Sequence, residues 1–84
     1  MTDDELIMLT WRYAAMIGII APDDRYSSEE EVNNDRERWP DLVVVENGDP
    51  VFDFDKCGAW MVEQSGEPLE RCRKTLFAEW GDKE

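Results

Sequence analysis

The distribution of apolar side chains predicts a long helix over residues 2–20. Apolar positions recur there at helical spacing in two adjacent stripes, and few polar residues interrupt them. The first stripe holds Leu6, Leu9, Tyr13, Ile17 and Ile20, and the second holds Ile7, Trp11, Ala14 and Gly18. Thr2 and Glu5 have the spacing of a capping box at the start of this helix, and Pro22 is expected to stop it.

This helix is apolar on nearly all sides, so it must be central to the core or covered in part by another chain. A chain of 84 residues has little surface with which to cover it. We therefore expect a homodimer through this helix, or an obligate partner, with Trp11 at the contact. Interfaces are rich in tryptophan, and Trp60 is a second contact candidate, whereas Trp39 and Trp80 fit the core.

A second and weaker helix is predicted over residues 28–39. Either Ser27 or Ser28 can cap it, with a glutamate three places on, and the proline at position 40 ends it. Its apolar stripe is thin, because it consists of Val32 and Trp39. We therefore expect Trp39, and little else, to hold this helix against the rest of the molecule.

Residues 42–54, LVVVENGDPVFDF, give the clearest local signal, which is that of a β-hairpin. Two runs rich in strand-forming residues flank Asn47-Gly48, a dipeptide typical of type I′ turns. The loop is either these two residues or the four residues 47–50, and both choices give the same two faces. Val43, Val45, Phe52 and Phe54 form an apolar face that should pack on the helices, and Val44, Glu46, Val51 and Asp53 form the other.

The rest of the chain predicts one ambiguous segment and one helix. Residues 59–63, AWMVE, fit either a third strand or a short helix, and their composition slightly favours a strand. Residues 68–80 predict a helix that buries Leu69, Cys72, Leu76 and Trp80 and ends at a glycine. The fold class is therefore α+β: a small antiparallel sheet, a hairpin with or without a third strand, packed against two or three helices. Residues 1–84 should form a single domain.

Charge narrows the classes of partner. The chain has 21 acidic and 9 basic residues, a formal net charge of −12. Such a field repels nucleic acids and anionic membranes and attracts basic protein surfaces. The longest apolar run, residues 6–20, is short for a bilayer span and follows acidic residues, unlike an export signal. We therefore expect a cytoplasmic protein with reduced thiols that binds neither nucleic acid nor membrane. A disulfide between Cys57 and Cys72 is the geometrically possible alternative to two free thiols.

Candidate chemistry is sparse. The sequence has no histidine, the commonest general base and metal ligand, and two cysteines fall short of a four-ligand zinc site. Cys72 lies on an apolar stripe and is expected to be a buried structural thiol. Residues 53–64 match three positions of an EF-hand-type loop, but Cys57 and Gln64 stand where two of its calcium ligands belong. We expect no enzymatic activity, no cofactor and no metal.

Acidic residues extend well beyond the SSEEE run at positions 27–31. A helix start explains three glutamates but not the rest, and their mutual repulsion costs stability, so a binding role is expected. With Trp11, the predicted partner-binding residues are Asp23, Asp24, Glu29, Glu30, Glu31, Asp35, Glu37, Glu46, Asp49, Asp53 and Asp55. We expect these carboxylates to form one binding face that imitates rows of DNA phosphates.

In composition, the chain resembles small acidic inhibitors from phages and mobile elements, including DNA mimics, anti-CRISPR proteins and inhibitors of uracil-DNA glycosylase. Its SSEEE run is also similar to colicin immunity proteins, although that family is all-helical and its paired tyrosines are missing here. The resemblance implies a non-catalytic, anti-defence type of protein that blocks a basic, nucleic-acid-handling protein. The alternative is a small dimeric adaptor or chaperone whose acidity serves solubility.

Overall fold

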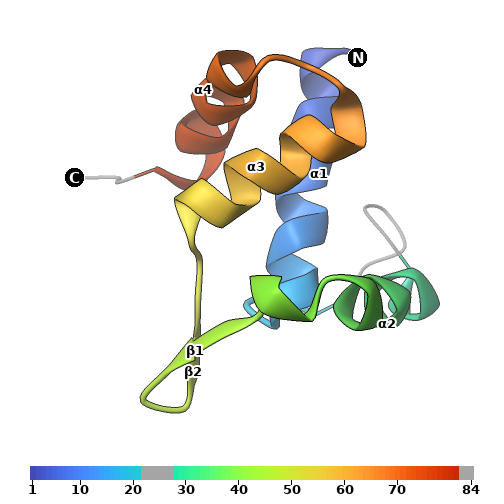
Figure 1. The fold of residues 1–84 in the computed structure, drawn as a ribbon, viewed down its shortest axis with the longest axis vertical. Helices are drawn as coiled ribbons and strands as arrows, with labels where there is room; N and C mark the ends of the chain where they lie inside the picture. Colours follow the sequence, from blue (N-terminus) through green and yellow to red (C-terminus); the bar gives the residue numbers. More distant parts are fainter. Residues whose placement is uncertain (22–27, 82–84) are drawn as a thin grey trace.

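The computed structural model describes residues 1–21 and 28–81, which form four α-helices, a short 3₁₀ helix and a β-hairpin (Figure 1). The α-helices are α1 (Asp3–Ile17), α2 (Glu29–Arg38), α3 (Phe54–Ser65) and α4 (Leu69–Trp80). The 3₁₀ helix η1 (Pro40–Leu42) leads into the antiparallel strands β1 (Val44–Glu46) and β2 (Asp49–Val51). The α+β class is confirmed, but the described residues contain four α-helices, not two or three, and their sheet has two strands.

Helix α1 is the centre of the fold and contacts the other three α-helices. The predicted capping box forms, and the Glu5 backbone N–H donates to the Thr2 hydroxyl at 3.2 Å. The helix ends earlier than predicted, because Gly18 adopts φ 92°, a left-handed conformation that suits glycine. The Gly18 N–H bonds back to carbonyls of the last turn, so the helix is closed before the proline at position 22 is reached.

The chain itself covers most of the apolar surface of α1. Leu6, Tyr13 and Met16 are fully buried, because α2, α3 and α4 pack around the helix. Met8 is 42% exposed, and Trp11 is half-buried. The chain thus covers more of this helix than its 84 residues suggested, but the coverage is incomplete, and the homodimer stays a prediction.

Residues 59–63 belong to helix α3, so the slight preference for a strand is wrong. The Asp53 carboxylate caps this helix and accepts a backbone N–H from its first turn at 3.0 Å. Cys57, Trp60 and Met61 are buried at helical spacing, and this period outweighs the strand propensity of the segment. The EF-hand-like segment is therefore mostly helix and not a loop.

The predicted hairpin is present and extends away from the helices (Figure 1), but it is shorter than residues 42–54. Phe54, predicted on its apolar face, is the first residue of α3. Asn47 has φ 52° and Gly48 has φ 83°, so the loop is a two-residue type I′ turn and the four-residue alternative is wrong. Val43 and Phe52 pack against the core at the base of the hairpin. Val45, however, is 57% exposed, so the predicted apolar face is covered only at its base.

Aromatic side chains join the base of the hairpin to the helices. Phe52 stacks on Trp80 with ring centroids 4.9 Å apart, and it meets Phe54 at 5.1 Å. Trp80 packs against the core but is only half-buried, and its Nε1 donates to the Thr10 hydroxyl at 3.0 Å. Leu69 is 49% exposed, so the predicted buried stripe of α4 is fully buried only at Cys72 and Leu76. Trp60 is only 2% exposed, so it belongs to the core and the prediction of a contact role for it is wrong.

The described helices are short. The longest of them, α1, has 15 residues, whereas a bilayer span needs about 20. No helix in the described part of the chain is long and apolar enough to cross a membrane. The cytoplasmic location stays a prediction.

Candidate interaction surfaces

Asp35 lies inside the junction of α1 and α2. Its carboxylate accepts two hydrogen bonds from Arg12, Nε to Oδ2 at 2.7 Å and Nη2 to Oδ1 at 2.9 Å. Asp35 is only 4% exposed, and these hydrogen bonds raise the pKa of Arg12 above its usual value. Asp35 therefore stabilises the junction and is not available to a partner, contrary to the predicted binding role.

Arg36 makes a second tie between α2 and α1. Its Nε donates to the Met16 carbonyl at 2.7 Å, and its Nη2 donates to the Ala15 carbonyl at 3.0 Å. These carbonyls lie in the last turn of α1, where intrahelical donors run out and a cation is favourable. Helix α2 is therefore held by two arginines and the fully buried Val32 as well as by Trp39, which corrects the expectation that Trp39 alone holds it.

Sequence reasoning missed this junction because its partners are far apart along the chain. Arg12 and Asp35 are 23 positions apart, and no helical or strand period connects them. The one signal in the sequence is Arg12, a charged residue between the two apolar stripes of its helix. A charged side chain that is partly buried needs a hydrogen-bonding or charged partner. That signal indicates that a partner exists without identifying it.

Four glutamates of α2 stay at the surface, and we call them the α2 surface: Glu29, Glu30, Glu31 and Glu37. Ser28 caps the helix and accepts the Glu31 backbone N–H at 3.1 Å, so three of them lie in the first turn, where negative charge is favourable. Glu31 lies 3.7 Å from Arg12. The other three form no ion pair with any described residue.

The hairpin carries a second group of carboxylates, the hairpin surface, which consists of Glu46 and Asp49. Both are exposed, and they stand directly opposite each other across the strands beside the turn. Neither forms an ion pair within the described part of the chain. Like charges in opposed positions destabilise a hairpin, so their presence here is not explained by folding.

The remaining predicted acids have different surroundings. Asp53 is half-buried, caps α3, and accepts the Tyr13 hydroxyl on its backbone carbonyl at 3.4 Å, so its role is structural. Asp55 is exposed in the first turn of α3. Asp23 and Asp24 lie outside the described residues.

The α2 surface and the hairpin surface are separate. Figure 1 shows α2 and the hairpin on opposite sides of the end of the molecule that lies away from the N-terminus. The η1 segment runs between them. The exposed acids of α2 and of the hairpin therefore form two surfaces in the described part of the chain, instead of the single face expected from the sequence.

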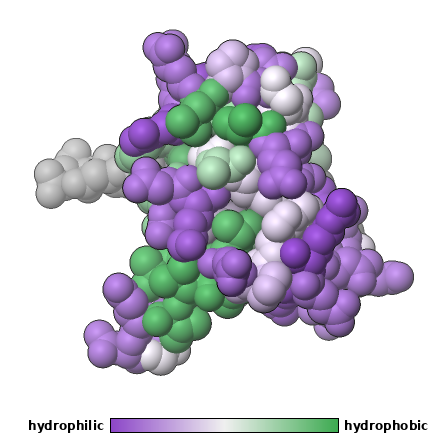
Figure 2. Space-filling model, in the orientation of Figure 1, coloured by the Kyte–Doolittle hydropathy of each residue, from purple (hydrophilic) through white to green (hydrophobic). Residues whose placement is uncertain are grey.

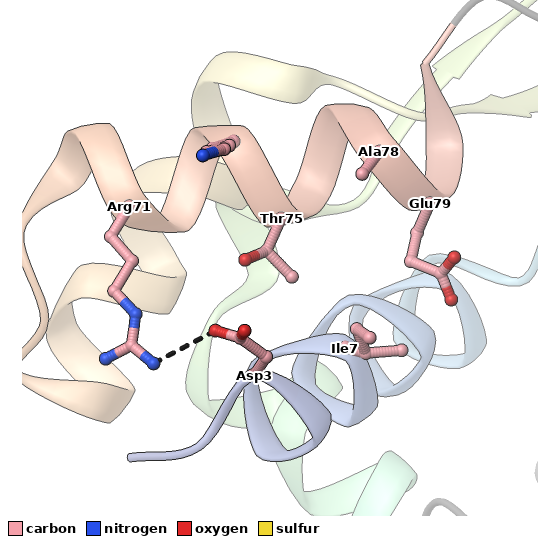
Figure 3. Close-up of a pocket in the computed structure, with 7 residues that line it drawn as sticks. Asp3, Ile7, Arg71, Thr75, Ala78 and Glu79 are labelled. Carbon is pink, nitrogen blue, oxygen red and sulfur yellow. Dashed lines mark hydrogen bonds and ion pairs between the residues drawn. The ribbon is translucent and has the colours of Figure 1, made fainter.

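Trp11 packs at the junction of α1 and α4. Its ring centroid lies 4.5 Å from that of Trp80, and its Nε1 donates to Glu79 Oε1 at 3.4 Å. A groove of about 360 Å³ lies between the same helices, and Arg71 reaches across it to Asp3 at 3.1 Å (Figure 3). Its lining consists of Asp3, Ile7, Arg71, Lys74, Thr75, Ala78 and Glu79. Both signs of charge line this groove, so it does not extend the acidic surfaces.

Cys57 and Cys72 are both free and fully buried. Burial raises the pKa of Cys57 well above its usual range, so its thiol keeps its proton at neutral pH and is a poor nucleophile. The prediction that Cys72 is buried is confirmed. Among residues 1–21 and 28–81, no group of three or more acidic or cysteine side chains is placed to hold a metal ion.

The chain was compared with models of protein families, with curated proteins and with solved structures, and none of them matched. Function must therefore be argued from the surfaces of the molecule. Their strongest features are the exposed carboxylates of the α2 surface and the hairpin surface.

Proposed function

We propose that this protein is a non-catalytic binding protein that occupies the basic surface of a nucleic-acid-handling protein. The observation that carries the proposal is that most exposed carboxylates of the α2 surface and the hairpin surface have no ion-pair partner among the described residues. Among the described residues before α3, Arg12 bonds to a buried carboxylate, Arg36 bonds to backbone carbonyls, and Arg38 lies 4.9 Å from the centroid of the Trp39 ring. Of these arginines, only Arg12 forms an ion pair with an exposed carboxylate of the two surfaces, Glu31 at 3.7 Å, and its hydrogen bonds go to the buried Asp35.

The field that remains suits a basic partner. The formal net charge of the whole chain is −12. The α2 surface has three consecutive glutamates in the first turn of the helix and a fourth about two turns further on. Such grouped carboxylates present to a basic groove negative charge of the kind it meets in nucleic-acid phosphates. Such a field speeds association with a basic surface and repels nucleic acid itself. We therefore expect a basic protein partner and no direct contact with DNA or RNA.

The dimeric adaptor or chaperone is the weaker candidate. Its main argument is an α1 too apolar to be covered by the chain, yet three helices cover most of that surface. Acidity that serves only solubility does not require two carboxylates directly opposite each other across a hairpin, where they cost stability. The opposed pair of Glu46 and Asp49 therefore favours the binding role.

Competitive capture from a lysate tests this proposal. Immobilised wild-type protein is incubated at low salt with a lysate of the source organism, and bound proteins are eluted with duplex DNA or RNA. We expect the nucleic acid to release nucleic-acid-binding proteins, because it competes for the same basic surface.

Two matched variants locate the effect. E29Q/E30Q removes two carboxylates from the α2 surface, and E63Q/E70Q removes two exposed carboxylates from α3 and α4. We expect E29Q/E30Q to capture less protein and E63Q/E70Q to capture as much as the wild type. Captured proteins that nucleic acid does not displace, or equal losses in the two variants, would contradict the proposal.

A further inference from the structure

We infer that the outer edge of β1 receives an extended, basic segment of the partner as a third strand. The inference rests on the proposed function, and it adds which part of the molecule the partner contacts and in what conformation. Its basis is the hydrogen-bonding register of the hairpin together with the placement of Val45, Glu46, Asp49 and Pro50.

The register decides which edge is open. Residues that flank a two-residue turn exchange both of their hydrogen bonds, so the opposed pair Glu46 and Asp49 bonds inward. Bonded and non-bonded pairs alternate along an antiparallel ladder, so the next pair, Val45 and Pro50, directs its backbone groups outward. Proline has no N–H, and the outer edge of β2 therefore lacks its donor. Val45 keeps both its N–H and its carbonyl, which leaves β1 as the open edge.

The outward N–H that precedes Val45 along the β1 edge already has an acceptor. The Val43 N–H donates to the Pro40 carbonyl of η1 at 3.2 Å. The hairpin projects from the helices (Figure 1), and β1 and β2 have their main contacts with each other. Proteins commonly protect edge strands with proline or charge, and here proline protects β2 while β1 has only Glu46. One strand edge is thus available at Val45.

The side chains beside this edge specify an alternating partner. Val45 is 57% exposed and lies on one face of the hairpin, whereas Glu46 and Asp49 lie on the other. Figure 2 shows apolar surface along the hairpin and polar surface at its tip. A strand added to β1 would place an apolar side chain beside Val45 and a lysine or arginine beside Glu46. That cation would also relieve the repulsion between Glu46 and Asp49.

A second copy of the chain fits this edge less well. Residues 42–53 contain no lysine or arginine, so pairing with the hairpin of a second copy would bring no cation opposite Glu46. The partner segment that fits this edge is therefore a strand with apolar residues on one face and basic residues on the other. It adds by backbone pairing, a mode of recognition that depends on main-chain hydrogen bonds for affinity and on alternate side chains for specificity.

Three synthetic peptides test the inference by NMR titration of ¹⁵N-labelled wild-type protein. The first alternates valine and lysine, the second is the same peptide N-methylated at its valines, and the third is N-methylated at its lysines. We propose antiparallel addition, in which the residue paired with Val45 shares its apolar face and is a valine whose N–H and carbonyl both point toward β1. We expect binding of the first and third peptides with large shifts at the Val45 amide, and about tenfold weaker binding of the second.

Two protein variants provide an independent test. Val45→Pro removes the outward N–H and should abolish pairing of the first peptide, without removing a hydrogen bond of the hairpin itself. Pro50→Val adds a donor to the β2 edge and should create a second binding position. Circular dichroism checks that both variants fold. If Val45→Pro does not fold, the comparison of the two N-methylated peptides on the wild-type protein still tests strand addition at β1.

The outcomes separate this inference from the proposed function. Equal binding of the two N-methylated peptides, or no binding of any peptide, would contradict strand addition at the β1 edge. Salt-sensitive binding without a preference between them would leave the acidic binding role in place, and the capture experiment tests that role separately. A dimer of the protein alone that protects the Val45 amide would show that a second copy covers the edge, and it would also overturn the inference.

Discussion

The α1–α2 junction and the β-hairpin use acidic residues in opposite ways. At the junction, Asp35 is 4% exposed and accepts both of its short hydrogen bonds from Arg12. At the hairpin, Glu46 and Asp49 are exposed and directly opposed, and neither is ion-paired in the described part of the chain. The first carboxylate stabilises the fold, whereas the other two weaken it slightly and remain accessible.

The comparison shows that net charge is a poor measure of accessible charge. The same residue types contribute to packing in one region and to the external field in the other. What separates them is burial and the presence of a guanidinium within hydrogen-bonding distance. Substitutions in the two regions should therefore change stability in opposite directions.

The largest effect on stability is expected at Arg12. Arg12→Ala leaves Asp35 buried without its partner and should lower the free energy of unfolding by about 3 kcal/mol, the lower end for buried pairs, because the Arg12 side chain is 25% exposed. Urea unfolding followed by circular dichroism measures this. Arg38→Ala, on the helix that carries Asp35, is the control and should cost less than about 1 kcal/mol, the value of an exposed contact with an aromatic ring. Similar losses in both variants would contradict the buried pair.

A smaller loss is expected at Arg36. Arg36→Ala removes both donors to the last turn of α1 and should lower the free energy of unfolding by about 1.5 kcal/mol. Arg36→Lys keeps the charge at the end of α1 but loses the paired donors, so its loss should be intermediate. Thermal unfolding of the three proteins tests this order. An alanine variant as stable as the wild type would show that Arg36 does not tie the helices together.

The hairpin should respond in the opposite direction. Glu46→Lys replaces a like-charge pair across the strands with an opposite-charge pair and should raise the free energy of unfolding by about 0.2–1 kcal/mol. The same substitution should weaken binding to a basic partner. Glu63→Lys makes the same change in net charge at an exposed position of α3 and serves as the control. If Glu63→Lys stabilises as much, relief of general repulsion and not the cross-strand pair is responsible.

The smallest effect concerns pH. Hydrogen bonding from Arg71 lowers the pKa of Glu67 below its usual value. A carboxyl whose pKa is lower in the folded state contributes stability above its unfolded pKa, and this contribution is lost as pH falls through the folded pKa. The stability advantage of the wild type over Glu67→Gln at neutral pH should therefore shrink below roughly pH 4.3. Urea unfolding from pH 7 to pH 3 measures the difference, and a difference that stays constant with pH would contradict it.

The features predicted from the sequence depend on neighbours along the chain. The Thr2 capping box and the Asn47-Gly48 turn have local causes, so their residues identify them. Residues 59–63 were ambiguous because strand propensity and helical period compete there, and packing of Trp60 into the core decides the outcome. Alternation along the hairpin predicted which side chains share a face but not whether a helix covers Val45.

The candidate site was predicted in part for the same reason. Exposure of Glu29 and Glu30 follows from their place in the first turn of a polar helix. Burial of Asp35 depends on Arg12, which lies on a different helix, and no local pattern reveals it. The division of the acids into two surfaces likewise depends on the path of η1 between α2 and the hairpin.

Association kinetics test the central claim, that the exposed carboxylates act in binding and not in folding. Wild type, E29Q/E30Q and the E63Q/E70Q control are compared for association with a basic protein released by nucleic acid in the capture experiment, at low and high salt. E29Q/E30Q should unfold within about 2 kcal/mol of the wild type, since each helix-terminus charge is worth roughly 0.3–1 kcal/mol. It should associate more slowly, and the wild-type rate should fall with salt, because screening acts within about 8 Å at physiological ionic strength. Equal association rates for all three proteins that salt does not change would show that the acidic start of α2 is only a helix cap with a solvated face.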